Sequence, residues 1–94
     1  MGEKILTLHP DGKAGVNIEQ AKYKTIKAAI LNAMEAEPEI TFANLTAAVK
    51  RDLGETFSGS IPWYVTTVKL DLEARDLVER VPNSSPQRLR LPRA

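Results

Sequence analysis

The chain has 94 residues, of which 43% are hydrophobic and 27% are charged, with a net charge of +1 and no cysteine. This length suffices for one domain with one core, and the lack of cysteine excludes disulfides, zinc–thiolate sites and thiol catalysis. No apolar stretch approaches the roughly 20 residues that span a bilayer, and no signal-peptide core begins the chain. We therefore expect a cytoplasmic protein with no membrane partner.

The N-terminal residues 1–17 predict an extended arm rather than a helix. Three apolar residues, Ile5, Leu6 and Leu8, precede the turn signals of His9-Pro10-Asp11-Gly12. Proline and glycine in such a cluster interrupt regular structure. We expect a short extended segment, then a turn, and then a globular domain over residues 18–94.

Two helices are predicted in the first half of that domain. The first runs from about Ile18 to Ala36, because Tyr23, Ile26, Ile30 and Met34 share one helical face. Glu37-Pro38 ends it, since the residue before a proline is disfavoured in helical geometry. Thr41 then caps a second helix, whose inward stripe is Phe42, Leu45, Val49 and Leu53. Gly54 is the expected stop.

The third helix is the most strongly patterned part of the chain. Ser60 can cap its start, and Pro62 lies in the first turn, where a missing N–H costs nothing. An apolar stripe at helical spacing contains Ile61, Val65, Val68 and Leu72. Arg75-Asp76 breaks the period, so we expect the helix to end there.

A β-hairpin is predicted to follow this helix. Leu77–Val81 and Arg88–Leu91 have the residues of two short strands, and Pro82–Pro86 has turn-forming residues throughout. The resulting order is helix, short strand, helix, helix, strand, loop, strand. We therefore predict an α+β fold, mostly α: a single winged helix-turn-helix domain with three helices, a C-terminal hairpin wing and an extended N-terminal arm.

Five segments also carry a resemblance to a known family. They are Leu8-His9-Pro10-Asp11, Ile40-Thr41-Phe42, Trp63-Tyr64-Val65, Lys69–Arg75 and Pro86–Leu91. On these segments the chain resembles a family of small uncharacterised bacterial winged-helix-like proteins. The resemblance covers nearly the whole chain and implies a fold but no activity. Related sequences prefer glycine where this chain has Asp76, and Asp tolerates left-handed backbone better than most residues.

No constellation in the sequence indicates catalysis or a cofactor. His9 is the only histidine, no serine lies in a nucleophile elbow, and no His, Asp and Glu cluster has metal-ligand spacing. Glu35, Glu37 and Glu39 alternate around a helix end and are interpreted as a solvated acidic rim. We expect a protein that is not an enzyme, with no catalytic residue, metal, cofactor or small-molecule ligand.

Positive charge is concentrated at the C-terminal end. Residues 77–94 contain Arg80, Arg88, Arg90 and Arg93 against Glu79 alone. In a winged helix the third helix enters the DNA major groove while the wing contacts the backbone. The leading prediction is therefore double-stranded DNA binding by Trp63, Thr66, Thr67, Lys69, Ser84, Ser85, Arg88 and Arg90. The third helix itself weakens this prediction, because Asp71 can pair with Arg75 one turn later and leaves no net positive charge.

A second apolar stripe supports a competing function. Trp63, Thr67, Leu70 and Ala74 recur at helical spacing on the side opposite the core stripe. A helix that is apolar on two faces is normally covered on both. The alternative is thus a protein-interaction or homodimerisation module that uses this interface and binds no DNA. Two covers stay open: the arm residues Ile5, Leu6 and Leu8, or a second copy related by a two-fold axis.

Overall fold

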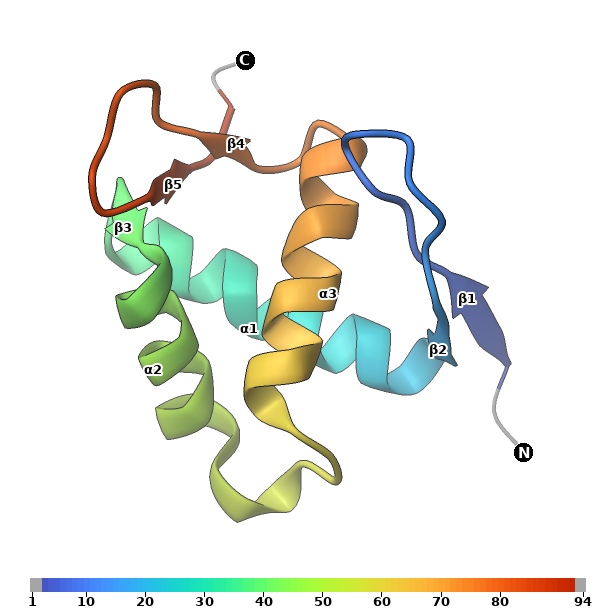
Figure 1. The fold of residues 1–94 in the computed structure, drawn as a ribbon. Helices are drawn as coiled ribbons and strands as arrows, with labels where there is room; N and C mark the ends of the chain where they lie inside the picture. The colour runs from blue at the N-terminus through green and yellow to red at the C-terminus, as the bar shows by residue number, and fades with distance from the viewer. Residues whose placement is uncertain (1–2, 93–94) are drawn as a thin grey trace.

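A computed structural model describes residues 3–92 and shows three helices with small antiparallel sheets (Figure 1). Helix α1 spans Gln20–Ala36, α2 spans Phe42–Leu53 and α3 spans Ile61–Ala74. The expected α+β, mostly helical class is confirmed. The predicted basic residue Arg93 lies outside the described residues.

The predicted caps of α2 and α3 are present. The Thr41 hydroxyl accepts a hydrogen bond from the Asn44 N–H at 3.1 Å, and the Ser60 hydroxyl accepts one from the Trp63 N–H at 3.4 Å. Gly54 ends α2 with a φ of +55° and opens the short 3₁₀ helix η1, Gly54–Thr56. Asp76 follows α3 with a φ of +61°, so the expected left-handed corner is also present.

The predicted start of the first helix was wrong by two residues. Asn17–Glu19 forms strand β2, which pairs antiparallel with strand β1, Lys4–Leu6, and places Ile5 opposite Ile18. The side chain of Ile18 is buried when the residue pairs in this hairpin. We infer that an extra half-turn of α1 would bury it less well. The arm is therefore a hairpin with an intervening loop, and not only an extended segment that ends in a turn.

The arm hairpin lies along α3, as the blue segment beside the C-terminal half of that helix in Figure 1 shows. Its loop is held by the Thr7 N–H, which donates to the Val16 carbonyl at 2.9 Å, and by the Val16 N–H, which donates to the Thr7 hydroxyl at 3.0 Å. At Gly15 a Cβ atom would lie 1.6 Å from the Thr7 carbonyl oxygen. Only glycine permits this close approach of the two halves of the loop.

The C-terminal strands join the segment before α2 in a three-stranded sheet. Strand β3, Ile40–Thr41, pairs with β5, Arg88–Arg90, which pairs in turn with β4, Glu79–Arg80. Both pairings are antiparallel. The predicted strand Leu77–Val81 is shorter than expected because the Leu77 and Val78 N–H groups both donate to the Leu72 carbonyl and so close the end of α3.

The core lies between the three helices and the inner face of this sheet. The predicted inward stripes are confirmed at Ile26 and Ile30 of α1, and at Val65, Val68 and Leu72 of α3, each fully buried. The other buried hydrophobic residues are Ile18, Tyr23, Ala29, Met34, Ile40, Leu45, Val49, Val78 and Leu89. Packing of α3 onto this core leaves its opposite face toward the arm and the solvent.

Candidate functional site

The outer face of α3 is partly covered by the arm and partly open. Thr67 and Leu70 are half-buried and line a cavity of about 170 Å³ between α3 and the arm loop. The arm contributes the rest of the lining, which is Thr7, Leu8, His9, Ala14, Gly15 and Val16. Ala74 is also half-buried, whereas Trp63, one turn before Thr67, is 47% exposed. We call the cavity and its lining the arm groove.

This geometry answers part of the question of what covers the second stripe. The arm covers the middle of the stripe, where Leu8 contributes to the lining of the arm groove. Ile5 packs against the core instead, and Leu6 remains 57% exposed. Trp63 is not among the residues that line the groove. The arm thus covers Thr67 and Leu70 but leaves the Trp63 side chain exposed to solvent.

The buried carboxylate of Asp71 holds the arm in this position. Its Oδ1 atom accepts a hydrogen bond from the Leu8 N–H at 2.8 Å. Its Oδ2 atom accepts one from the Tyr23 hydroxyl and another from the Arg75 Nε at 2.9 Å. Asp71 is fully buried. One side chain of α3 therefore ties together α1, α3 and the arm.

Two neighbouring pKa values reflect this arrangement. Burial raises the pKa of Tyr23 to about 12, and the hydrogen bond and negative charge of Asp71 act in the same direction. The hydrogen bond to Asp71 raises the pKa of the Arg75 guanidinium. The Asp71–Arg75 pair was predicted as a pair within α3, and it is present. The burial of Asp71 and its contacts with Tyr23 and Leu8 were not predicted.

Lys69 points into the protein and away from the solvent. It is 5% exposed, and its Nζ lies 2.9 Å from the Glu73 Oε2. The same ammonium group donates to the Gln87 Oε1 at 3.3 Å and lies 5.1 Å from the centre of the Phe42 ring. In this conformation its ammonium group interacts with side chains of α2, of α3 and of the segment before β5. It is not positioned to contact a phosphate, as the DNA prediction requires.

The arginines of β4 and β5 have internal partners as well. The Arg80 Nε lies 2.6 Å from the Glu73 Oε1, and the Arg90 Nε lies 3.3 Å from the Glu79 Oε1. Arg88 is exposed, and its guanidinium reaches only the Glu39 carbonyl, at 3.4 Å. The positive charge of the wing is therefore largely offset by adjacent carboxylates, and Arg88 is the arginine among these three that is most open to a ligand.

The remaining predicted contacts are divided between wing and helix. The Ser84 hydroxyl donates to the Val81 carbonyl at 2.9 Å and accepts from the Arg88 N–H at 3.1 Å, so it shapes the wing loop. Ser85 is exposed in that loop. Thr66 is exposed on α3, where its hydroxyl donates to the Pro62 carbonyl. The structure does not bring these residues and Lys69 into one solvent-facing cluster.

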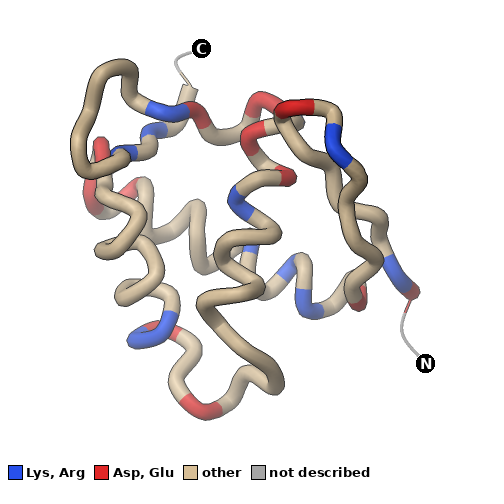
Figure 2. Tube along the Cα trace, in the orientation of Figure 1, with Lys and Arg blue, Asp and Glu red and all other residues tan. Residues whose placement is uncertain are grey.

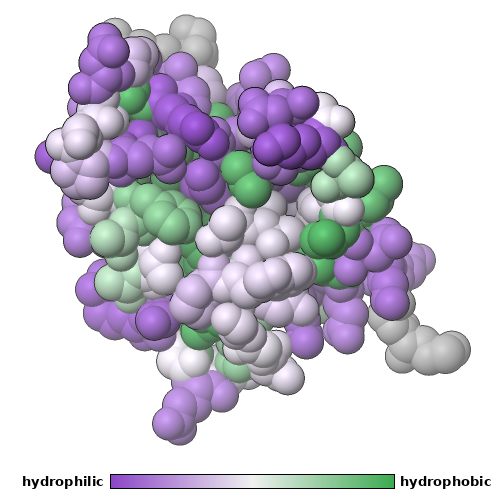
Figure 3. Space-filling view, viewed as in Figure 1, coloured by the Kyte–Doolittle hydropathy of each residue, from purple (hydrophilic) through white to green (hydrophobic). Residues whose placement is uncertain are grey.

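The N-terminal half of α3 presents an uncharged surface. Residues 61–68 carry no charged side chain, and Figure 2 shows this part of α3 entirely in tan. In the space-filling view, white and green dominate over α2 and α3, and purple gathers around the margin (Figure 3). The Trp63 ring packs edge-to-face on Tyr64, with ring centres 4.9 Å apart, and Tyr64 packs similarly on Phe57 at 5.1 Å. These contacts hold the tryptophan in place while nearly half of it remains exposed.

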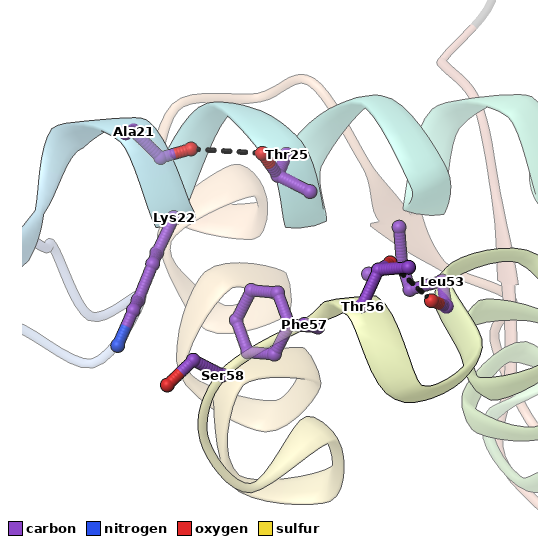
Figure 4. A pocket seen from close by; sticks show the side chains of 7 residues that line it. All are labelled: Ala21, Lys22, Thr25, Leu53, Thr56, Phe57 and Ser58. Atoms are coloured by element: carbon purple, nitrogen blue, oxygen red, sulfur yellow. Dashed lines mark hydrogen bonds between the residues drawn. The ribbon is translucent and has the colours of Figure 1, made fainter.

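A second cavity, of about 260 Å³, lies between α1 and the connector from α2 to α3 (Figure 4). Phe57 of the connector is one of the residues that line it, and Lys22 extends from α1 toward Ser58. The Thr25 hydroxyl donates to the Ala21 carbonyl of α1, and the Thr56 hydroxyl donates to the Leu53 carbonyl at the end of α2. Lys22 is therefore the one ionisable side chain in a lining that is otherwise neutral.

The part of the chain that the structure describes holds no cluster of three or more His, Asp or Glu side chains suited to a metal ion. The Nδ1 atom of His9 accepts a hydrogen bond from the Asp11 N–H at 3.1 Å within the arm loop. Within residues 3–92, no helix has the length and apolar character needed to cross a membrane.

Comparison with known proteins identifies a family. Neither the curated proteins nor the solved structures contain a significant match to the chain. A family model described as a family of unknown function (DUF6958) matches residues 4–89. This range includes all three helices, the arm groove and most of the wing. The resemblance to an uncharacterised family is thus confirmed, and the chain belongs to the family of unknown function DUF6958.

Proposed function

We propose that this chain is a non-enzymatic binding module that contacts another protein through the outer face of α3. The observation that carries the proposal is the position of Trp63, which is 47% exposed on the uncharged half of α3. It lies on the same helical stripe as Thr67 and Leu70, which line the arm groove. Tryptophan is enriched at the energetic centres of protein interfaces. A firmly packed indole next to an open apolar groove has the features of such a centre.

The arrangement of elements supports a winged-helix-like scaffold for this module. Strand β3 precedes α2, and the two strands after α3 are joined by a loop and pair in the sheet order β3-β5-β4. That is the order expected for a helix-turn-helix with a wing. We use it as support for the scaffold alone, because fold does not determine function.

The charge distribution on α3 favours a protein partner over DNA at this face. Lys69 is the one cation of Ile61–Ala74, and it is buried against Glu73 and Gln87. Phosphate contacts supply most of the affinity of DNA-binding proteins and come mainly from accessible lysine and arginine. An α3 that entered the major groove in this conformation would offer threonine, proline and tryptophan but no exposed positive charge.

Cavity size favours a protein partner over a small-molecule substrate. The cavities on the described surface include four with volumes of about 170, 180, 260 and 290 Å³. Pockets for small molecules and cofactors usually measure roughly 300–1,000 Å³. A cavity of about 150 Å³ holds a benzene-sized group, so the arm groove suits one apolar side chain of a partner.

Selection from a displayed random-peptide library tests this proposal. The library would be selected on the folded chain, and enriched peptides would be labelled with a fluorophore and titrated with each variant of the chain while the fluorescence anisotropy of the peptide is followed. We expect enriched peptides to contain an apolar side chain, and we expect Trp63→Ala to weaken their binding at least about tenfold, the loss typical of a central interface residue. Leu77→Ala is the matched control, because Leu77 is 40% exposed outside the arm groove. Peptides that bind Trp63→Ala and the wild type equally would refute the proposal.

Binding of double-stranded DNA through the wing is the second candidate, supported by the exposed Arg88 beside Arg80 and Arg90. Such binding would be non-specific, with a dissociation constant of roughly 10⁻⁴–10⁻⁶ M, and would weaken steeply with salt. Titration of the chain with a mixed-sequence duplex at low and moderate salt separates the candidates. Salt-dependent binding that Arg88→Ala/Arg90→Ala weakens, and that Trp63→Ala leaves intact, would favour DNA.

A further inference from the structure

The outer face of α3 has both a projecting side chain and a recess, and they lie on one stripe. Trp63 projects near the helix start, and the arm groove opens beside Thr67 and Leu70, four to seven residues later. At 1.5 Å of rise per residue, this separation is roughly 6–10 Å along the helix axis. An exposed residue, Thr66, lies near the midpoint.

From this arrangement, and resting on the proposed function, we infer that the partner is a second copy of the same chain. Two copies of α3 would pack antiparallel about a two-fold axis near Thr66, and Trp63 of each copy would enter the arm groove of the other. In a two-fold interface, each contact occurs twice with the roles exchanged. A protrusion and a recess of suitable spacing on one face satisfy that requirement.

The charges and the shape of the face are compatible with self-pairing. Residues 61–68 carry no charge, so pairing this segment with its own copy brings no like charges together. Threonine at the crossing point is small enough for two helices to approach to the usual interaxial distance of roughly 8–10 Å. The space-filling view shows the surface over α3 as mostly white to pale lavender, with green patches beside it and deep purple at the surrounding margin (Figure 3).

Thr66→Glu tests this pairing without disturbing the monomer. Thr66 is exposed, and its hydroxyl bonds only within its own helix, to the Pro62 carbonyl at 3.0 Å. Thr25→Glu is a matched control, because Thr25 is exposed on α1 and donates to the Ala21 carbonyl at 3.0 Å in the same way. In sedimentation velocity over a range of protein concentrations, we expect the wild type and Thr25→Glu to dimerise. We expect Thr66→Glu to raise the dimer dissociation constant at least about tenfold, because it places two carboxylates face to face.

Disulfide trapping gives a second readout that does not depend on stability. The chain contains no cysteine, so Thr66→Cys and Thr25→Cys each introduce a single thiol. Near a two-fold axis, Cα atoms can lie within the 4.4–6.8 Å that a disulfide needs. Under mild oxidation we expect Thr66→Cys to form covalent dimers at least about tenfold faster than Thr25→Cys.

The outcomes separate this inference from the proposed function. A wild-type chain that stays monomeric up to about 1 mM, with equal trapping of the two cysteine variants, overturns the self-pairing. If peptides still bind through Trp63 in that case, the protein-binding role stands and its partner is another protein. If the chain neither dimerises nor binds peptides through Trp63, both proposals are refuted. A dimer that Thr66→Glu leaves intact also overturns the inference, because its interface would lie elsewhere.

Discussion

Replacing Asp71 with asparagine tests whether this carboxylate fixes the arm on α3. The substitution keeps the shape of the side chain but removes its charge and turns one oxygen into an amide donor. The remaining oxygen can still accept from the Leu8 N–H, which now lies 2.8 Å from Oδ1. The new NH₂ group would face Tyr23 and the Arg75 Nε, which now donate to Oδ2.

The expected cost follows from these partners. The Tyr23 hydroxyl can rotate and accept from the amide, but the Arg75 Nε cannot, and it loses a charge-assisted bond of about 1.5–3 kcal/mol. The Arg75 side chain is 36% exposed and can turn to water, so the larger penalty of a fully buried orphan charge does not apply. We expect Asp71→Asn to lower the free energy of unfolding by about 2–3 kcal/mol. For a domain of this size, that corresponds to a Tm decrease of roughly 8–24 °C.

Urea denaturation measures the free energy, and amide hydrogen exchange shows where the change occurs. The Leu8 N–H then donates to a neutral amide oxygen, which is a weaker acceptor than a carboxylate, so we expect Asp71→Asn to increase exchange at Leu8 and across the arm loop more than in the core of α3. Arg75→Ala is the control: it removes the partly exposed partner and leaves the Asp71 bonds to Leu8 and Tyr23. A variant within about 0.5 kcal/mol of the wild type, or one with unchanged Leu8 exchange, would refute the view that Asp71 anchors the arm.

Three further predictions concern the same framework. The fold raises the pKa of Tyr23 from 10.0 to about 12, so the neutral phenol stabilises the folded state fully below pH 10. This stabilisation is lost as the pH rises toward 12, and the free energy of unfolding falls by up to about 2.7 kcal/mol. Urea denaturation at pH 9 and 11 should show this extra loss in the wild type and not in Tyr23→Phe. Gly15→Ala should open the arm loop, lower stability by about 1–3 kcal/mol and increase Leu8 amide exchange, and an unchanged exchange rate would contradict the close approach seen there. Lys69→Met should cost about 3 kcal/mol, because it leaves the buried Glu73 carboxylate without one of its partners, and a loss below about 1 kcal/mol in thermal denaturation would argue that the pair is solvated.

Much of the fold could be predicted because its signals are local. Thr41 and Ser60 have the hydroxyls that cap a helix within three residues, and both caps form. Asp76 was expected at a left-handed corner, and it has a φ of +61°. The core stripes depend only on helical periodicity. In each case the sequence within one or two turns contains the physical cause of the structure.

The arm could not be predicted in the same way, because its hairpin depends on distant partners. Pairing of Ile5 with Ile18 crosses a loop of ten residues, and the anchor of that loop, Asp71, lies 63 residues after Leu8. In the sequence, Asp71 and Arg75 form an ordinary i,i+4 pair, which is the same pattern whether the carboxylate is exposed or buried. A tyrosine on the core face of α1, Tyr23, was the one available indication, since a buried phenol needs a hydrogen-bond acceptor.

The charged residues of α3 support the proposal that this helix contacts a protein and not DNA. Its ionic side chains all lie in the second half, and the structure directs them inward: Lys69 and Glu73 connect to the wing, and Asp71 to the arm. The part of α3 that faces the solvent is therefore its uncharged first half, and Trp63 is exposed at the start of that half. Burying those charges has a desolvation cost that is offset only because each has a partner from another element. The same contacts that fix the arm and the wing therefore remove positive charge from the face of α3, and they place an apolar groove beside its tryptophan.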